Sequence, residues 1–82
     1  MTRVTAQFFG PAADVAGCTE RSYDLGDEAT LGELIARLHS DYPQIESAAK
    51  SIRFAVNCEF AEPATRLRAG DEVAVIPPVS GG

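Results

Sequence analysis

Apolar and polar residues alternate along several short stretches of the chain, and this alternation predicts β-strands. From Val4 to Phe9, the residues Val4, Ala6 and Phe8 would share one face of a strand. A second alternating run covers residues 20–25, after a break at Gly10-Pro11. Because the two runs are close in sequence, we expect them to pair as an antiparallel hairpin.

A helical pattern begins at Thr30. Thr30 and Glu33 have the spacing of a capping box, in which the hydroxyl and the carboxylate both satisfy free backbone amides. Pro43 ends the pattern, which predicts the main helix. A short helix at 12–16 and a loose helical turn at 45–50 are also expected. The apolar residues at helical spacing in the main helix are Leu31, Leu34, Ile35, Leu38 and Tyr42.

The second half of the chain alternates between strands and turns. Residues 53–56 and 72–76 read as strands, and residues 57–59 and 69–71 as turns. A short strand is expected at Phe60-Ala61. This order of elements predicts an α+β fold of the ubiquitin or β-grasp kind, a mixed sheet with one main helix packed across it.

Length and charge narrow the class of protein. The 82 residues suffice for one small domain, and the net charge of −5 disfavours nucleic acid, which needs a basic surface. No apolar run is long enough for a membrane. Because Met1 leads directly into a strand pattern without a secretory leader, we expect a cytoplasmic location.

Few residues are candidates for metal binding or catalysis. Cys18 and Cys58 are far apart in sequence, and His39 is the only histidine. A zinc site needs about four ligands, so these three residues favour reduced, structural thiols and a histidine at the edge of the helix stripe. No general base or nucleotide-binding loop is recognisable. The sequence therefore predicts no metal site and no cofactor of its own.

The end of the chain has a composition unlike the rest. Pro77 and Pro78 lack the amide hydrogen that a strand pair needs, so we expect a domain at 1–76 and an extended tail at 77–82. Six residues reach about 20 Å at ~3.3 Å each. Without Cβ atoms, Gly81 and Gly82 could thread a channel in another protein. The alternative is a frayed terminus that happens to end in glycine.

Several stretches together resemble one family. They are the strand at 4–9, the Ala55-Val56-Asn57 segment, Leu67 with Gly70-Asp71-Glu72-Val73, and the ending at 76–82. The chain resembles the small, sulfur-carrying subunit of molybdopterin synthase over almost its whole length. Related sulfur carriers for thiamine synthesis and tRNA thiolation share the fold and the terminal Gly-Gly, but usually lack the Pro-Pro-Val-Ser-Gly-Gly ending.

The resemblance implies a reaction at Gly82. An E1-like adenylating enzyme would join the Gly82 carboxylate to AMP, using ATP, and a sulfur donor protein would convert the adenylate to a thiocarboxylate. The large subunit of molybdopterin synthase would then receive the tail and pass the sulfur to precursor Z. The chain alone would be non-catalytic. Besides Gly81, the tail residues expected to contact this partner are Pro77, Pro78, Val79 and Ser80.

A docking surface is implied by strand parity together with the resemblance. Phe9 and Ile76 would point away from the helix, and Phe60 follows a turn. The family docks its partners through a hydrophobic sheet surface near the tail, and these three residues match it. Alternatively, one or more of them fills a minor core under the loop at 59–68. Glu59 and Glu62 would face a basic rim on the partner, or belong to an ordinary solvated surface.

Two other functions remain open. In one, the protein is a ubiquitin-like modifier whose Gly82 forms isopeptide bonds with target proteins. Lys50 is the only lysine, which leaves little scope for chains of such a modifier. In the other, the protein is an interaction domain without chemistry, and its last residues are dispensable.

Overall fold

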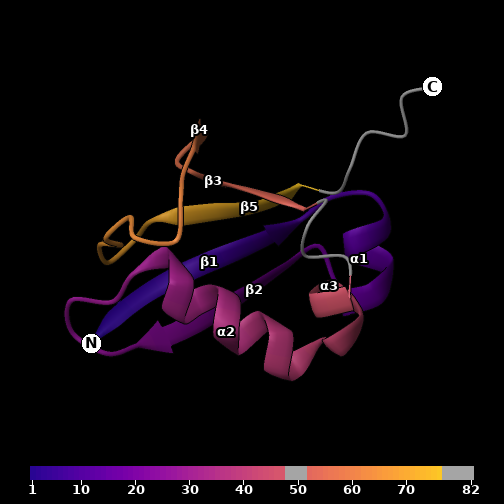
Figure 1. Cartoon of the computed structure of the whole chain (residues 1–82), viewed down its shortest axis with the longest axis horizontal. Coiled ribbons are helices and arrows are strands. Elements are labelled where there is room, and N and C mark those ends of the chain that lie inside the picture. The colour runs from indigo at the N-terminus through magenta and orange to yellow at the C-terminus, as the bar shows by residue number, and fades with distance from the viewer. Residues whose placement is uncertain (48–51, 77–82) are drawn as a thin grey trace.

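A five-stranded mixed sheet with one main helix across it forms the body of the computed structural model, which describes residues 1–47 and 52–76 (Figure 1). The strand order is β2-β1-β5-β3-β4, and only β1 and β5 run parallel among these pairs. The elements are β1 (Thr2–Phe8), α1 (Pro11–Ala16), β2 (Glu20–Leu25), α2 (Leu31–Asp41), α3 (Pro43–Ser47), β3 (Arg53–Val56), β4 (Glu59–Phe60) and β5 (Glu72–Ile76).

The predicted hairpin of the first two strands is confirmed. β1 and β2 are antiparallel, with Val4 opposite Tyr23. Val4, Ala6 and Phe8 are buried on the face toward α2, as the alternation predicts. Arg21 alternates in step with the buried residues Tyr23 and Leu25 of β2, but it is exposed. Its guanidinium lies 5.1 Å from the centre of the Tyr23 ring and donates to the hydroxyl of Tyr42, 2.9 Å away.

The start of α2 differs in part from the predicted capping box. The Thr30 hydroxyl accepts from the Glu33 amide at 3.4 Å, as expected for an N-cap. The Glu33 carboxylate, however, accepts from the Gly26 amide at 3.2 Å and not from the backbone of Thr30. The loop before α2 brings Gly26 within reach of that carboxylate, which sequence spacing does not reveal.

The short elements are shifted slightly from their predicted positions. α2 ends at Asp41, and Pro43 then starts α3, where proline is tolerated because the first turn needs no amide donor. The helical turn is therefore at 43–47 and not at 45–50, and residues 48–51 lie outside the described residues. β4 begins at Glu59, one residue before the predicted strand.

The core lies between the sheet and α2. Leu31, Leu34 and Leu38 project from α2 and are fully buried against the sheet, where Val73 and Val75 of β5 are also fully buried. Burying one such side chain stabilises a fold by about 1.5–3 kcal/mol. In the parts of the chain that the structure describes, no helix has the length and apolarity needed to cross a membrane.

Candidate functional site

The last strand, β5, lies in the interior of the sheet and ends at the residue before the predicted tail. β5 pairs with β1 on one side and β3 on the other, and Ile76, its last residue, lies opposite Arg53. A strand paired on both sides is held more firmly than an edge strand. The predicted reacting and threading residues, Pro77, Pro78, Val79, Ser80, Gly81 and Gly82, lie outside the described residues.

Strand register shows which side chains share the face that points away from α2. Ala55 pairs with Ala74 on one side and with Phe60 on the other, so these three side chains lie in one row. Val73 and Val75 point into the core, so Ala74 and Ile76 point to the opposite face. Phe60 and Ile76 therefore lie on the same face of the sheet.

Two of the three predicted docking residues are exposed. Phe60 is 73% exposed and Phe9 is 49% exposed, while Ile76 is half-buried. Phe9 directly follows Phe8, which pairs with Val75, so Phe9 lies near the end of β5. The exposed fractions of Phe9 and Phe60 contradict the alternative that either fills a minor core. We call the surface of Phe60, Ala74 and Ile76, with Phe9 just beyond the end of β1, the apolar face. Ala55 shares their row but is itself buried.

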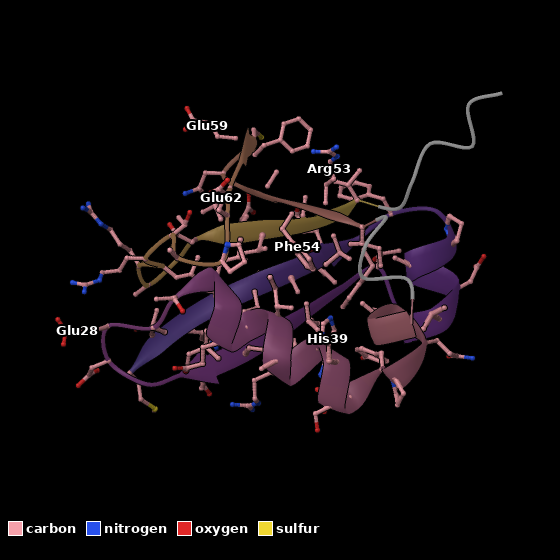
Figure 2. All side chains as sticks on the ribbon, viewed as in Figure 1. Glu28, His39, Arg53, Phe54, Glu59 and Glu62 are labelled. Carbon is pink, nitrogen blue, oxygen red and sulfur yellow. The ribbon has the colours of Figure 1, made fainter. Side chains whose placement is uncertain are left out.

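Charged residues surround the apolar face. On the β2 side, the outward residues are polar, and Arg3 and Asp24 form an exposed ion pair of 3.6 Å. Arg53 is paired with Ile76 and lies on the side of the sheet away from α2, whereas Phe54, paired with Val75, lies on the helix side (Figure 2). Glu59 is paired with Val56, which is paired with Val73, so by register Glu59 does not share the face of Ile76. Both carboxylates predicted to face a partner, those of Glu59 and Glu62, belong to exposed residues. The exposed apolar side chains of this face thus come from β5, from β4 and from the residue after β1.

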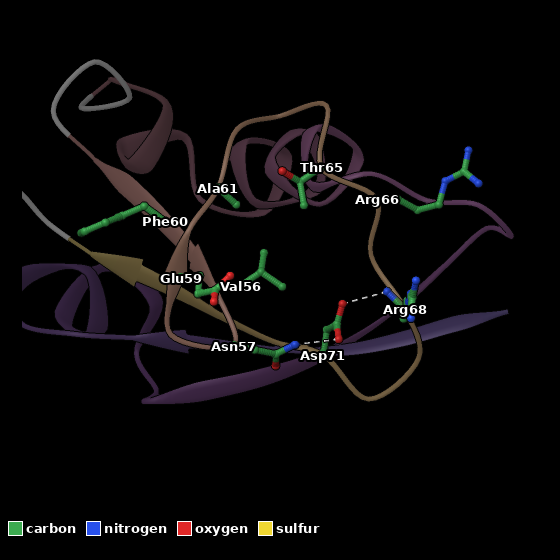
Figure 3. Close-up of a pocket in the computed structure, with 9 residues that line it drawn as sticks. All are labelled: Val56, Asn57, Glu59, Phe60, Ala61, Thr65, Arg66, Arg68 and Asp71. Carbon is green, nitrogen blue, oxygen red and sulfur yellow. Dashed lines mark hydrogen bonds between the residues drawn. The ribbon is translucent and has the colours of Figure 1, made fainter.

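The β3–β4 hairpin carries Phe60, and its tip is bonded to the start of β5. Asn57 and Cys58 form its two-residue loop, with φ angles of 50° and 73°. The Asn57 side-chain nitrogen donates to Asp71 Oδ1 at 2.9 Å (Figure 3). The Asn57 side-chain oxygen accepts from the Glu72 backbone amide at 3.0 Å. This contact was not predicted from the sequence, although asparagine's tolerance of positive φ was a usable signal.

The potential metal ligands are dispersed. Cys18 is half-buried, Cys58 is exposed at the hairpin tip, and His39 lies half-buried on α2 beside a small cavity between α2 and β3. Within residues 1–47 and 52–76, no group of three or more histidine, cysteine, aspartate or glutamate residues is placed to hold a metal ion. The apolar face is therefore the best-defined candidate site.

Comparison with known proteins places these features in a family context. Residues 6–82 match the model of the ThiS family. The molybdopterin synthase sulfur carrier subunit of Chlamydomonas reinhardtii is 38% identical over 98% of this chain and 99% of its own length. The subunit of that name from Mycobacterium tuberculosis is 32% identical over the full length of both chains.

Solved structures agree with the fold. Small archaeal modifier protein 1 of Haloferax volcanii has a TM-score of 0.87 at 29% identity, covering 96% of this chain and 100% of that one. A chain from the complex of subunits 1 and 2 of molybdopterin-converting factor from Helicobacter pylori has a TM-score of 0.73 at 26% identity. The match covers 99% of this chain and 100% of that one. The predicted ubiquitin-like β-grasp fold is confirmed.

Proposed function

The chain belongs to the ThiS family, and we propose that within it the protein is the sulfur-carrier subunit of a molybdopterin synthase. The observation that carries this proposal is the likeness to a subunit of that name over nearly the full length of both chains. The position of the apolar face supports it, because Ile76 belongs to that face and also immediately precedes the tail.

In this proposal the chemistry occurs at the Gly82 carboxylate. A carboxylate is a weak electrophile, so an E1-like adenylating enzyme joins it to AMP and releases pyrophosphate from ATP. The terminal sulfur of a persulfide on the donor protein then attacks the carbonyl carbon and AMP leaves, which gives an acyl disulfide. A thiol attacks the donor's sulfur in this disulfide, so that the thiocarboxylate is released and the donor is left in a disulfide with that thiol. Attack by its sulfur on precursor Z transfers the sulfur, and a water oxygen restores the carboxylate. Covalent attachment keeps the sulfur nucleophile next to its acceptor.

Docking on the large subunit uses the apolar face. Phe9, Phe60 and Ile76 enter the interface, and residues 77–80 lead the terminal glycines into the partner's active site. Because Ile76 of β5 belongs to the apolar face, docking of this face fixes the position from which the tail extends. The relative from Helicobacter pylori was solved as a complex of subunits 1 and 2 of molybdopterin-converting factor, which supports a partner of this kind. The catalytic groups belong to the partner proteins.

The proposal also includes the boundary between domain and tail and the location of the protein in the cell. Residues 1–76 form the β-grasp domain and residues 77–82 form the tail that reacts. The adenylating enzyme, the sulfur donor and the large subunit meet the protein in the cytoplasm, where ATP is present.

Intact-mass measurement tests this function. The protein is incubated with its adenylating enzyme, ATP and a sulfur donor, and a control incubation lacks ATP. We expect a mass gain equal to replacement of one oxygen by one sulfur, and transfer of that sulfur to precursor Z once the large subunit is added. An unchanged mass would contradict the proposal. Covalent attachment of the chain to other proteins, seen as adducts of high mass, would favour the modifier function. The likeness to small archaeal modifier protein 1 makes this the alternative to test.

A further inference from the structure

Two stretches that are distant in sequence meet in a hydrogen-bonded clamp. The clamp consists of the side chains of Asn57 and Asp71 and the backbone amides of Arg68 and Glu72. Asn57 donates to Asp71 Oδ1 at 2.9 Å and accepts from Glu72 at 3.0 Å, while Asp71 Oδ2 accepts from the Arg68 amide at 2.8 Å. The two dashed lines in Figure 3 show both carboxylate oxygens of Asp71 in use. The clamp thus bonds the hairpin tip to the turn before β5.

Phe60 depends on the hairpin for its position. β4 has two residues and lies at the edge of the sheet, where only β3 pairs with it. Phe60 itself is 73% exposed, so packing of its own ring holds it weakly. Besides the strand pairs, the backbone bond from Ala61 to the Phe54 carbonyl, 3.0 Å long, supports the returning chain. At its tip the hairpin is held by the clamp and by the backbone bond from the Asn57 amide to the Glu72 carbonyl, 2.8 Å long.

The pocket next to Phe60 also indicates that side-chain packing contributes little to the position of the hairpin. A hollow of about 510 Å³ lies between the hairpin and the loop that leads to β5, and Phe60, Asn57 and Asp71 all line it. Side chains therefore do not fill the space between hairpin and loop. Bonds across the end of this hollow keep its two walls at a set separation.

We propose that Asn57 and Asp71 are positioning residues for partner docking, because they hold the hairpin so that Phe60 is already in its docking position. A binding residue that is ordered beforehand loses less conformational freedom on association, and affinity rises accordingly. This inference rests on the proposed function for its partner, the large subunit. The geometry of the clamp in the free chain does not depend on that partner.

A double-mutant cycle tests the proposal. Asn57→Gly removes both side-chain bonds and still adopts the positive φ of this position. Cys58→Gly is the matched control, since it places glycine at the other positive-φ residue of the same loop and removes no clamp bond. We expect Asn57→Gly to weaken binding to the large subunit about tenfold, and Cys58→Gly by less than about twofold. In a Phe60→Ala background, Asn57→Gly is expected to have almost no further effect.

Amide hydrogen exchange of the free chain gives a second readout. With Asn57→Gly, exchange at the Ala61 amide is expected to become about tenfold faster. Exchange at the Phe8 amide, which bonds to the Thr19 carbonyl in the other hairpin, is expected to stay unchanged. If wild-type protein fails to bind the large subunit, the proposed function is wrong, and hydrogen exchange alone decides whether the clamp holds the hairpin.

Three results would overturn the inference. One is equal binding by the Asn57→Gly and Cys58→Gly variants. Another is an undiminished effect of Asn57→Gly when Phe60 is already alanine. The third is unchanged exchange at Ala61. If Asn57→Gly does not fold, the same cycle is run with Asp71→Asn, which keeps the shape of the side chain but supplies one acceptor where the clamp uses two.

Discussion

Replacing Phe60 by alanine is expected to weaken partner binding far more than it weakens the fold. A phenylalanine side chain buries about 150–250 Å² when fully covered. Since Phe60 is 73% exposed in the free chain, about a quarter of that area contributes to folding. At about 25 cal/mol per Å², folding loses roughly 1 kcal/mol, and covering the remainder in an interface is worth about 3–4 kcal/mol.

These magnitudes give two measurable results for Phe60→Ala. The melting temperature should fall by less than about 8 °C, because 1 kcal/mol shifts a domain of this size by about 4–8 °C. Titration calorimetry with the large subunit should show binding weaker by about 100-fold or more, since each 1.4 kcal/mol is about tenfold. Both measurements use the same protein preparation.

A second phenylalanine provides the matched control for this experiment. Phe54 belongs to the same hairpin but packs against the core, so Phe54→Ala should lower the melting temperature more than Phe60→Ala does. Binding by Phe60→Ala within about twofold of wild type would refute the assignment of Phe60 to the interface. Loss of the fold in Phe60→Ala would refute the area argument itself.

The remaining predictions concern the tail, the strand before it and one buried tyrosine. Deleting Gly82, or appending a tag after it, should abolish sulfur transfer in a reconstituted synthase without changing the melting temperature, and Gly81→Val should slow transfer because a branched side chain obstructs a narrow channel. Normal transfer by tagged protein would contradict the proposed reaction. Ile76→Asp should weaken calorimetric binding to the large subunit while circular dichroism stays native, because a charge is costly in a desolvated interface. Burial and the hydrogen bond to Asp41 raise the pKa of Tyr23. The phenolate absorbance of Tyr23 should therefore appear at higher pH in the folded protein than in protein unfolded by urea. Coincident titration curves for folded and unfolded protein would contradict this.

The Tyr23 pKa also has a consequence for stability. The folded-state pKa lies above the unfolded value of about 10, so the stabilisation is fully present below pH ~10. It is lost as the pH rises through the folded-state pKa. Denaturant titrations at increasing alkaline pH should therefore show a falling free energy of unfolding. Asp41→Asn should lower the Tyr23 pKa, because it removes the carboxylate that accepts the hydroxyl proton at 2.8 Å.

Much of the candidate site was predictable because it depends on local rules. Alternation placed Ile76 on the outward side of β5, and an exposed position for Phe60 followed from the turn before it. Phe9, predicted as the last residue of the first strand, is exposed but lies just after β1, which ends at Phe8. Turn chemistry also located the loop at Asn57. The role of these residues in docking remains a prediction, as does the reaction at Gly82, because residues 77–82 lie outside the described structure.

The sequence by itself determined the elements that depend on neighbours a few residues apart. The alternation of β1 and β2, the apolar stripe of α2 and the strand at 72–76 all reflect periodicity along one segment. The Thr30 cap has the same local origin, since its partner amide is three residues away. Such patterns are readable because side-chain direction follows directly from position within a helix or strand.

Only the tertiary structure decided which distant segments meet. The placement of β5 between β1 and β3 brings Ala74, Ala55 and Phe60 into one row, and no local pattern specifies that order. The Glu33 carboxylate bonds to Gly26, and Asn57 bonds to Asp71, because folding brings these groups within about 3 Å. Hydrogen bonds between separated segments depend on the path of the whole chain, whereas alternation and helical spacing depend on one segment alone.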